Sequence, residues 1–271
     1  MGTQIGVAAD GEVLWASEGR SETTAQRAGA AGFRDLRTLA ELIARSDVVI
    51  SLCPPAIAEE VASQVVETGF RGLYLEANAV APARAERIAA LLGERGARLV
   101  DGAVIARRGL NLYLSGETED VEEVAAIFAD SDVRAIPLAG GAGAASALKM
   151  AFGGWNKIGI ALEAQAYAIA RAYGVEQALG EEGVESERVV HAGQKAWRWA
   201  PEMEEVAETC ATLGVPDGMG RGAAALYARW ADHRDQPIDL DRLLDEVAPA
   251  DDGRSWRKAI PESPSNKHRS N

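Results

Sequence analysis

Apolar and polar positions follow two different patterns along this chain, and the change of pattern divides it into two parts. Up to about residue 139, short apolar runs of strand length alternate with stretches of helical periodicity. After residue 143 the helical pattern continues, and no run in it fits a strand. The runs that we expect to form strands are residues 13–16, 47–53, 73–77, 98–100, 112–114 and 133–137.

The helical stretches between these runs are residues 21–31, 38–44, 57–67, 82–92 and 121–129. Nearly continuous apolar strands separated by helices are typical of a mostly parallel sheet that is covered on both faces. A long helix is expected over residues 144–173, with further helices to residue 248. The sequence therefore predicts an α/β domain at residues 1–140 and an all-helical domain at residues 141–250. The polar residues 251–271 are expected to form a disordered tail.

The chain begins without the element that normally opens a doubly wound sheet. That element is a strand followed by a glycine-rich turn and a helix, whose N-terminus holds the pyrophosphate of a dinucleotide. Here residues 2–9 already have the pattern of that helix, and residues 11–17 that of the second strand. Met1 and Gly2 match the last two positions of a G-x-G-x-x-G motif, so we expect Gly2 at the pyrophosphate and a Rossmann-type sheet whose first strand is missing. A misassigned start, a truncation or a loss from the gene would each explain this pattern. Under each of these explanations, we expect the 271-residue chain to bind the cofactor weakly.

Charge and cysteine content narrow the function classes. The formal net charge is −13, which disfavours nucleic acid and membrane surfaces as partners. Cys53 and Cys210 have no CxxC partner, which argues against a zinc site or a disulfide framework. No signal peptide and no apolar run of about 18 residues is present, so we expect a cytoplasmic protein.

Both acidic and basic side chains follow the strand expected at residues 13–16. In dinucleotide-binding sheets an acidic residue here accepts hydrogen bonds from the ribose of NAD, whereas an arginine pairs with the 2′-phosphate of NADP. Glu18 would serve the first role and Arg20 the second. Because Ser21 follows Arg20, we favour NADP, with NAD possible. The alternative is that Ser21 only caps the next helix and that Arg20 is a solvated loop residue.

Several segments together resemble the β-hydroxyacid dehydrogenases and 6-phosphogluconate dehydrogenases, most closely the phosphogluconate-dehydrogenase-like branch. The resemblance covers residues 1–248. The segments that carry it are Gly-Arg-Ser at 19–21, Leu-Cys-Pro-Pro at 52–55, Glu-Ala-Asn-Ala-Val-Ala-Pro at 76–82, Val-Asp-Gly-Ala-Val at 100–104 and the glycine-rich turn leading to Lys149 at 140–149. The resemblance implies cofactor contacts by Cys53, Pro54 and Asn78, a substrate contact by Val104 and a catalytic role for Lys149.

Two departures from this family concern the substrate. Ile105, Ala106 and Arg107 stand where the family has Ser-Gly-Gly, and Gly153 stands where it usually has asparagine. In the family those positions hold the carboxylate and hydroxyl of a hydroxy acid. The resemblance therefore implies the fold but leaves the substrate open.

Lys149 lies in an apolar stretch near the start of the long expected helix. Hydride transfer between an alcohol and a nicotinamide needs a proton carrier at the oxygen, and burial lowers the pKa of a lysine toward the range where it can serve. Helical spacing places Gly153, Asn156 and Lys157 on the same face, where Asn156 and Lys157 are candidate substrate ligands. The alternative is that Lys149 merely extends from a packed helix to solvent.

These observations predict an NAD(P)-dependent oxidoreductase for a small, polar, hydroxy-acid-like substrate, without a metal. A cofactor-impaired scaffold protein and an imine reductase remain alternatives. The long alanine-rich helix carries more apolar surface than a small helical domain can cover, so we expect a homodimer.

Overall fold

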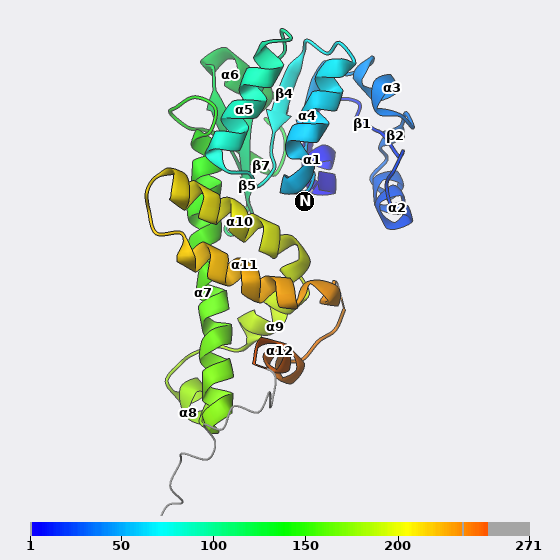
Figure 1. The fold of residues 1–271 in the computed structure, drawn as a ribbon. Helices are drawn as coiled ribbons and strands as arrows, with labels where there is room; N and C mark the ends of the chain where they lie inside the picture. The colour runs from blue at the N-terminus through cyan, green and yellow to red at the C-terminus, as the bar shows by residue number, and fades with distance from the viewer. Residues whose placement is uncertain (1, 235, 249–271) are drawn as a thin grey trace, which may run out of the picture.

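The computed structural model describes residues 2–234 and 236–248. An α/β part holds the N-terminal half of the chain, and a helical part lies below it in the view of Figure 1. This arrangement confirms the fold class expected from the sequence. The tail expected at residues 251–271 lies outside the described residues.

The main sheet has five strands in the order in which they occur along the chain. They are β3 (Val48–Ser51), β4 (Leu73–Glu76), β5 (Arg98–Ile105), β6 (Leu110–Gly116) and β7 (Val133–Pro137). All neighbours pair in parallel except β5 and β6, which are antiparallel. Only residues 106–109 join β5 to β6, and such a short connection permits a hairpin but no crossover.

Helices cover both faces of this sheet, because alternate strand residues point to opposite sides. Val49 and Tyr74 pack on one side with α3 (Leu39–Ile43), α4 (Ala58–Glu67) and α5 (Pro82–Gly93). Leu73 and Leu75 pack on the other side with α1 (Gly2–Ala8) and α6 (Thr118–Ala126). A short turn of 3-10 helix, η1 (Pro55–Ile57), precedes α4.

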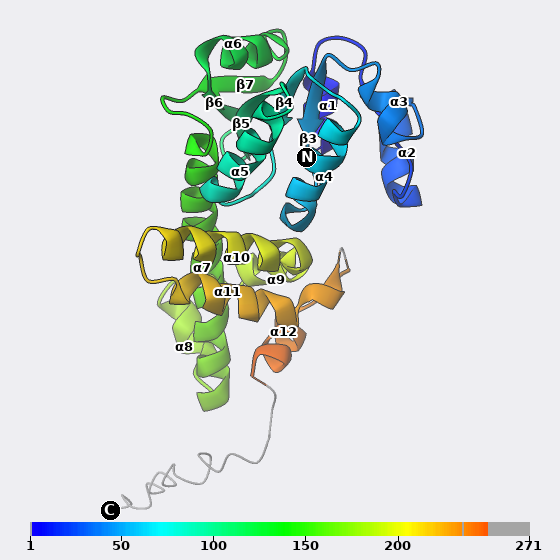
Figure 2. The ribbon, with the colours of Figure 1, turned by 45° about the horizontal axis from the view of Figure 1, so that its top comes forward.

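A second, two-stranded sheet stands beside the main one. It pairs β1 (Leu14–Trp15) in parallel with β2 (Arg34–Asp35), and α2 (Glu22–Ala30) connects the two strands. Figures 1 and 2 both show this unit to the side of β3 and α4. Among the described residues no strand pairing joins β1 to β3. The sequence analysis missed β2 because its two residues are polar and exposed and so give no apolar run.

The helical part is built around α7 (Ala144–Tyr173), which starts at the main sheet and runs down through the helical part in Figure 1. The other helices are α8 (Glu176–Glu181), α9 (Glu187–Gly193), α10 (Ala196–Thr212), α11 (Gly218–Arg229), η2 (Ala231–His233) and α12 (Leu240–Val247). Their core contains Trp199, Tyr227 and Trp230, whose rings meet edge to face. The part of α7 beyond the sheet is thereby fixed against α10 and α11.

Candidate functional site

The carboxyl ends of β3 and β4 carry a network of polar side chains centred on Asn78. Its amide oxygen accepts a hydrogen bond from the backbone N–H of Cys53, and its amide nitrogen donates to Oγ of Ser51 at 2.9 Å. Its own backbone N–H donates to Oε1 of Glu76 at 3.0 Å. Asn78 thus fixes the loop after β3, including Pro54, and brings together three of the cofactor residues expected from the sequence.

Glu76 is a fully buried acid at the end of β4. Burial is the main reason why its pKa rises to about 7, and the charge of Asp101 contributes in the same direction. Its Oε2 atom has no hydrogen-bond partner among the described residues. Burial also raises the pKa of the neighbouring Tyr74, and the charge of Glu76 adds to that shift. This acid therefore changes its protonation near neutral pH inside the sheet.

Asp101 anchors the start of α7 to the middle of the sheet. Its Oδ2 accepts hydrogen bonds from the backbone N–H groups of Gly143 and Ser146, both at 2.9 Å. Its Oδ1 accepts from the hydroxyl of Ser146 at 2.7 Å. A buried carboxylate with several donors holds a helix start firmly. The position of Lys149, one turn further along α7, follows from this anchor.

Lys149 carries its amine into the junction between the sheet and the helical part. The ammonium group donates to the backbone carbonyl of Val104, at the end of β5, at 2.6 Å. Burial lowers the pKa of Lys149, and the charges of Lys157 and Arg198 lower it further, while Glu202 raises it. A lysine with a lowered pKa accepts and releases a proton more readily than an exposed one.

A second buried amine, Lys157, forms an ion pair with Glu202 of α10. The side chains of both residues are 11% exposed, and the Lys157 ammonium also lies 5.5 Å from the ring centre of Trp199. The pair is packed against the glycine at position 153. A Cβ atom on Gly153 would lie 2.9 Å from Oε1 of Glu202, too close for an ordinary contact.

Glu205, one turn beyond Glu202 on α10, ties the helical part to the α/β part. Its Oε2 accepts from the backbone N–H of Ala81 at 2.7 Å, at the start of α5. Its Oε1 pairs with Arg84 at 2.9 Å. Because this link fixes α10 against α5, Glu202 is brought beside α7.

At the end of β1, Ser21 caps α2 by accepting a hydrogen bond from the backbone N–H of Thr24. Ser21 therefore has the helix-capping role that the sequence analysis gave as an alternative. Arg20 is exposed, and its charge acts on the thiol of Cys53 after β3. Gly2, at the start of α1, lies against Leu52, where a Cβ on the glycine would be 3.9 Å from the leucine Cβ. Arg20, Gly2 and Cys53 thus border the same end of the sheet.

Arg107 and Asn156 lie beside Trp155, which α7 exposes to solvent. Arg107, from the turn between β5 and β6, stacks on the exposed ring of Trp155 at 4.7 Å. Asn156 is half-buried, and its side chain makes no hydrogen bond to the described residues. Arg107 and Asn156 therefore contribute less to the junction than Lys149 and Lys157.

Sequence reasoning missed four acidic residues that organise the junction: Glu76, Asp101, Glu202 and Glu205. The first two gave a usable signal, since an acid inside an apolar strand run must have buried partners. The two α10 acids gave none, because acids at helical spacing are usual on an exposed helix.

The residues at the carboxyl ends of β1 and β3 fit a dinucleotide. The guanidinium of Arg20 has no acidic partner among the described residues, so it is available to a phosphate. No group of three or more described His, Cys, Asp or Glu residues is placed to hold a metal ion. Of the helices that the structure describes, none is both long and apolar enough to cross a membrane.

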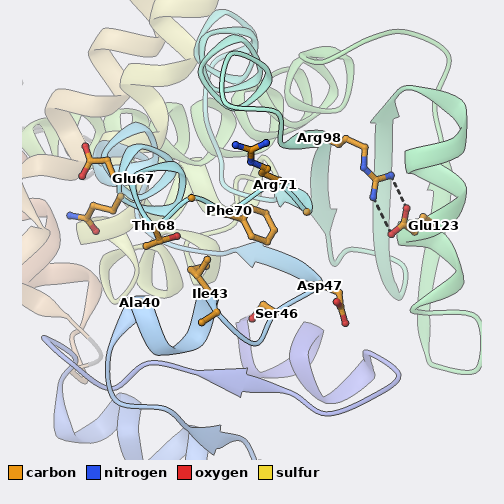
Figure 3. Close-up of a pocket in the computed structure, with 14 residues that line it drawn as sticks. Ala40, Ile43, Ser46, Asp47, Glu67, Thr68, Phe70, Arg71, Arg98 and Glu123 are labelled. Carbon is orange, nitrogen blue, oxygen red and sulfur yellow. Dashed lines mark hydrogen bonds and ion pairs between the residues drawn. The ribbon is translucent and has the colours of Figure 1, made fainter.

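A surface cavity of about 930 Å³ lies at the opposite end of the sheet (Figure 3). Asp47, Gly72 and Arg98, which line it, stand at the amino ends of β3, β4 and β5. Arg98 is already paired there with Asp120 and Glu123. Ligands of parallel α/β sheets bind at the carboxyl ends of the strands. We therefore place the candidate site at the junction and not in this cavity.

Comparisons with known proteins agree with this architecture. Residues 170–230 match a family model described as a domain of unknown function, DUF1932. No curated protein is significantly similar in sequence to this chain.

Three solved structures share the fold over nearly their whole length. The 3-hydroxyisobutyrate dehydrogenase of Mycobacterium tuberculosis, solved with L-serine, has a TM-score of 0.65 at 17% identity, and the match covers 92% of this chain and 96% of that one. The conserved protein MTH1747, described as structurally similar to 3-hydroxyacid dehydrogenases, has a TM-score of 0.60 at 24% identity, with 88% and 95% covered. Psf3, solved with NADP+ and 2-OPP, has a TM-score of 0.61 at 12% identity, with 91% and 95% covered. This chain therefore shares the fold of these structures, an α/β domain followed by a helical domain.

Proposed function

We propose that this protein is an NAD(P)-dependent oxidoreductase that acts on a small polar substrate, with Lys149 as the proton donor and acceptor. The observation that carries the proposal is the half-buried amine of Lys149, held by the Val104 carbonyl where α7 meets the sheet. The fold supports it, since one solved structure of this architecture is a 3-hydroxyisobutyrate dehydrogenase and another, Psf3, holds NADP+. The cofactor would supply or accept the hydride.

Residues 1–140 would bind the cofactor. Arg20 and Ser21 would face its adenosine end, with the Arg20 guanidinium on a 2′-phosphate, which favours NADP. Gly2 would border the pyrophosphate. Cys53, Pro54 and Asn78 would line the nicotinamide end, in the shape that the Asn78 network imposes on the loop after β3.

Residues 141–250 would bind the substrate and a second subunit. The Val104 carbonyl binds the Lys149 amine and the charge of Lys157 acts on it, while Asn156, next to Lys157 on α7, would be a further substrate ligand. In alcohol oxidation the neutral amine of Lys149 accepts the hydroxyl proton, and in reduction its ammonium form donates one. The rate of oxidation should therefore rise with pH through the pKa of Lys149. We place this activity in the cytoplasm.

The proposal is tested with Lys149→Met, which keeps the length and apolar bulk of the side chain. A panel of 3-hydroxy acids and cyclic imines is offered with NADPH or NADP+, and turnover is followed by cofactor absorbance. We expect a loss of about 10²- to 10⁴-fold in kcat for the accepted substrate, the usual contribution of a proton carrier. Lys195→Met, which removes another lysine from the same helical part, should retain the parent rate. Unchanged turnover by Lys149→Met would contradict the role of Lys149.

Calorimetric titration with NADPH and NADH tests the cofactor. Tighter binding of NADPH is expected from the Arg20 contact. Equal affinities would show that Glu18 sets the site. Failure to bind either cofactor would favour the scaffold function.

Imine reduction is the second candidate within this proposal. Ile105 and Ala106 place no polar side chain at the end of β5, and Gly153 places none on α7. A hydroxy acid would lack those hydrogen-bond partners, whereas an imine does not need them. Turnover of imines alone in the panel would favour this activity.

A further inference from the structure

The distribution of lysine in this chain is unusual. Of its 28 cationic side chains only five are lysines, namely Lys149, Lys157, Lys195, Lys258 and Lys267. Two of these lie eight positions apart on α7, at the candidate site, while arginine serves nearly everywhere else. Arginine stays charged at all physiological pH values, whereas a buried lysine changes its pKa readily. The candidate site therefore holds two of the few lysine amines of this chain.

The Lys157–Glu202 pair fills the space one helical turn beyond Lys149. A Cβ atom on Gly153 would lie 3.7 Å from Nζ of Lys157 and 2.9 Å from Oε1 of Glu202. Lys149 and Gly153 are four positions apart and so lie on the same face of α7. The side chain of Lys157 thus runs back along the helix toward Lys149, as long side chains on helices do. The absence of a side chain at position 153 makes room for the pair.

Among the described residues, the charges that act on Lys149 come from two helices. Glu202 and Arg198 act from α10, and Lys157 acts from α7 itself, while β5 contributes the uncharged carbonyl of Val104. Of these, only Glu202 is an acid. If Glu202 had no other partner, its negative charge would favour the ammonium form of Lys149 and so hold the proton there. Instead its Oε1 is bound by Lys157.

We propose that Lys157 is a positioning residue: it holds the Glu202 carboxylate in a buried ion pair and so prevents that carboxylate from keeping Lys149 permanently protonated. Lys149 is then free to pass between amine and ammonium during turnover. This inference rests on the proposed role of Lys149 as the proton carrier. It assigns roles to Lys157 and Glu202 that differ from substrate binding, and it gives a reason for glycine at position 153.

Lys157 and Glu202 have opposite effects on the midpoint of the Lys149 titration, so removing one or the other should shift it in opposite directions. Removing the charge of Lys157 leaves Glu202 free to act on Lys149, so the midpoint of the Lys149 titration should move to higher pH. Removing the charge of Glu202 leaves a second ammonium beside Lys149, so the midpoint should move to lower pH. A role of the pair in packing alone predicts no such opposition.

The test is an NMR titration of the free protein labelled with ¹³C at the lysine Cε. Because the chain has five lysines, the spectrum has five signals, and the Lys149 signal is assigned by its loss in Lys149→Arg. Lys157→Gln should shift the Lys149 midpoint upward and Glu202→Gln should shift it downward. The double variant, in which both charges are absent, should return it close to the parent value. Lys195→Gln is the control, and it should leave the Lys149 titration unchanged.

Shifts of the same sign in the two single variants, or no shift in either, would overturn the proposal. Circular dichroism and urea unfolding establish that each variant is folded. If Lys157→Gln does not fold, Glu202→Gln decides alone, since only a downward shift agrees with the proposal. The readout needs neither cofactor nor substrate. A failure of the proposed oxidoreductase function would therefore leave this titration intact, and the two outcomes are distinguishable.

Discussion

At the scale of single residues, the carboxyl end of β4 shows how burial changes acid–base chemistry. Glu76 has an ordinary pKa of 4.5 when exposed and about 7 in the folded protein, mainly because it is buried. The folded state therefore holds this proton to a higher pH than the unfolded chain. The resulting stabilisation is complete below about pH 4.5 and is lost as the pH rises through about 7.

Replacing Glu76 with glutamine should remove this pH dependence. Between pH 5 and pH 9 we expect the parent protein to lose about 3 kcal/mol of unfolding free energy through Glu76, since one pKa unit corresponds to about 1.4 kcal/mol. Over the same pH range, the unfolding free energy of Glu76→Gln should fall by about 3 kcal/mol less than that of the parent protein. Urea unfolding at each pH measures this difference. Glu94→Gln, an exposed acid after α5, is the matched control and should follow the parent. A parallel pH dependence of the parent and Glu76→Gln would contradict the buried titration.

A site residue could be found from the sequence only where its residue type stood out from its neighbours in the chain. Lys149 stood out as a lone charge in an apolar helical stretch, a pattern that fits a site residue and a lysine extending to solvent equally, and the structure places its amine against the Val104 carbonyl. Whether it acts in catalysis stays a prediction. Glu202 could not be found, because its partner Lys157 lies 45 positions away and on another helix.

At the scale of elements, the packing of α7 on α10 depends on two adjacent glycines. A Cβ on Gly153 would meet Glu202, and one on Gly154 would lie 3.1 Å from a methyl group of Val206. Gly159, on the same helix, has no atom within 4 Å of such a Cβ. Glycine in a helix interior is destabilising unless close packing requires it.

Alanine substitutions should separate these two situations. Gly159→Ala should raise the free energy of unfolding by about 0.5–1 kcal/mol through helix propensity alone. Gly153→Ala should instead lower it by about 1–3 kcal/mol, the usual cost of overpacking. Chemical denaturation of the two variants gives the comparison directly. Equal stabilisation by both would mean that α10 moves away from α7 at little cost.

Most elements could be predicted because their apolar periodicity is strong. The extents of β3, β4, β7 and α7 follow the sequence pattern closely, whereas β5 and β6 are longer than the runs expected at residues 98–100 and 112–114. The helix expected at residues 121–129 begins earlier, at Thr118, because polar first-turn residues carry no apolar signal. The antiparallel direction of β6 is explained by the short connection between β5 and β6, and the composition of the strand gives no sign of it.

At the scale of the whole molecule, one side of α7 remains uncovered by the described chain. Trp155, Leu162 and Ile169 are 61%, 63% and 59% exposed, and they recur every seven residues along the helix. An apolar stripe of this kind is typical of a helix that packs against another helix. We therefore retain the prediction of a homodimer formed through α7.

An acid at the centre of the stripe should separate the subunits. We expect the parent protein to be dimeric at micromolar concentration and Leu162→Glu to be monomeric, as measured by light scattering after gel filtration. Val7→Glu makes the same change at an exposed position of α1 and should leave the dimer intact. A monomeric parent protein would remove the prediction.

The division of the sheet has a consequence for how the native protein fluctuates. Residues 11–44 hold β1, α2, β2 and α3, and only Ala28 and Ile43 among them are buried. Opening of this unit would expose little apolar surface and break no strand pairing with β3. It should therefore unfold locally, as a separate cooperative unit, at a free energy well below that of the whole molecule. Native-state hydrogen exchange should show the amides of β1 and β2 exchanging faster than those of β4 and β5. Equal protection throughout would refute this independence.

Since the unit carries Arg20, any ligand bound by that arginine should slow the exchange of the whole unit by drawing it onto the main sheet.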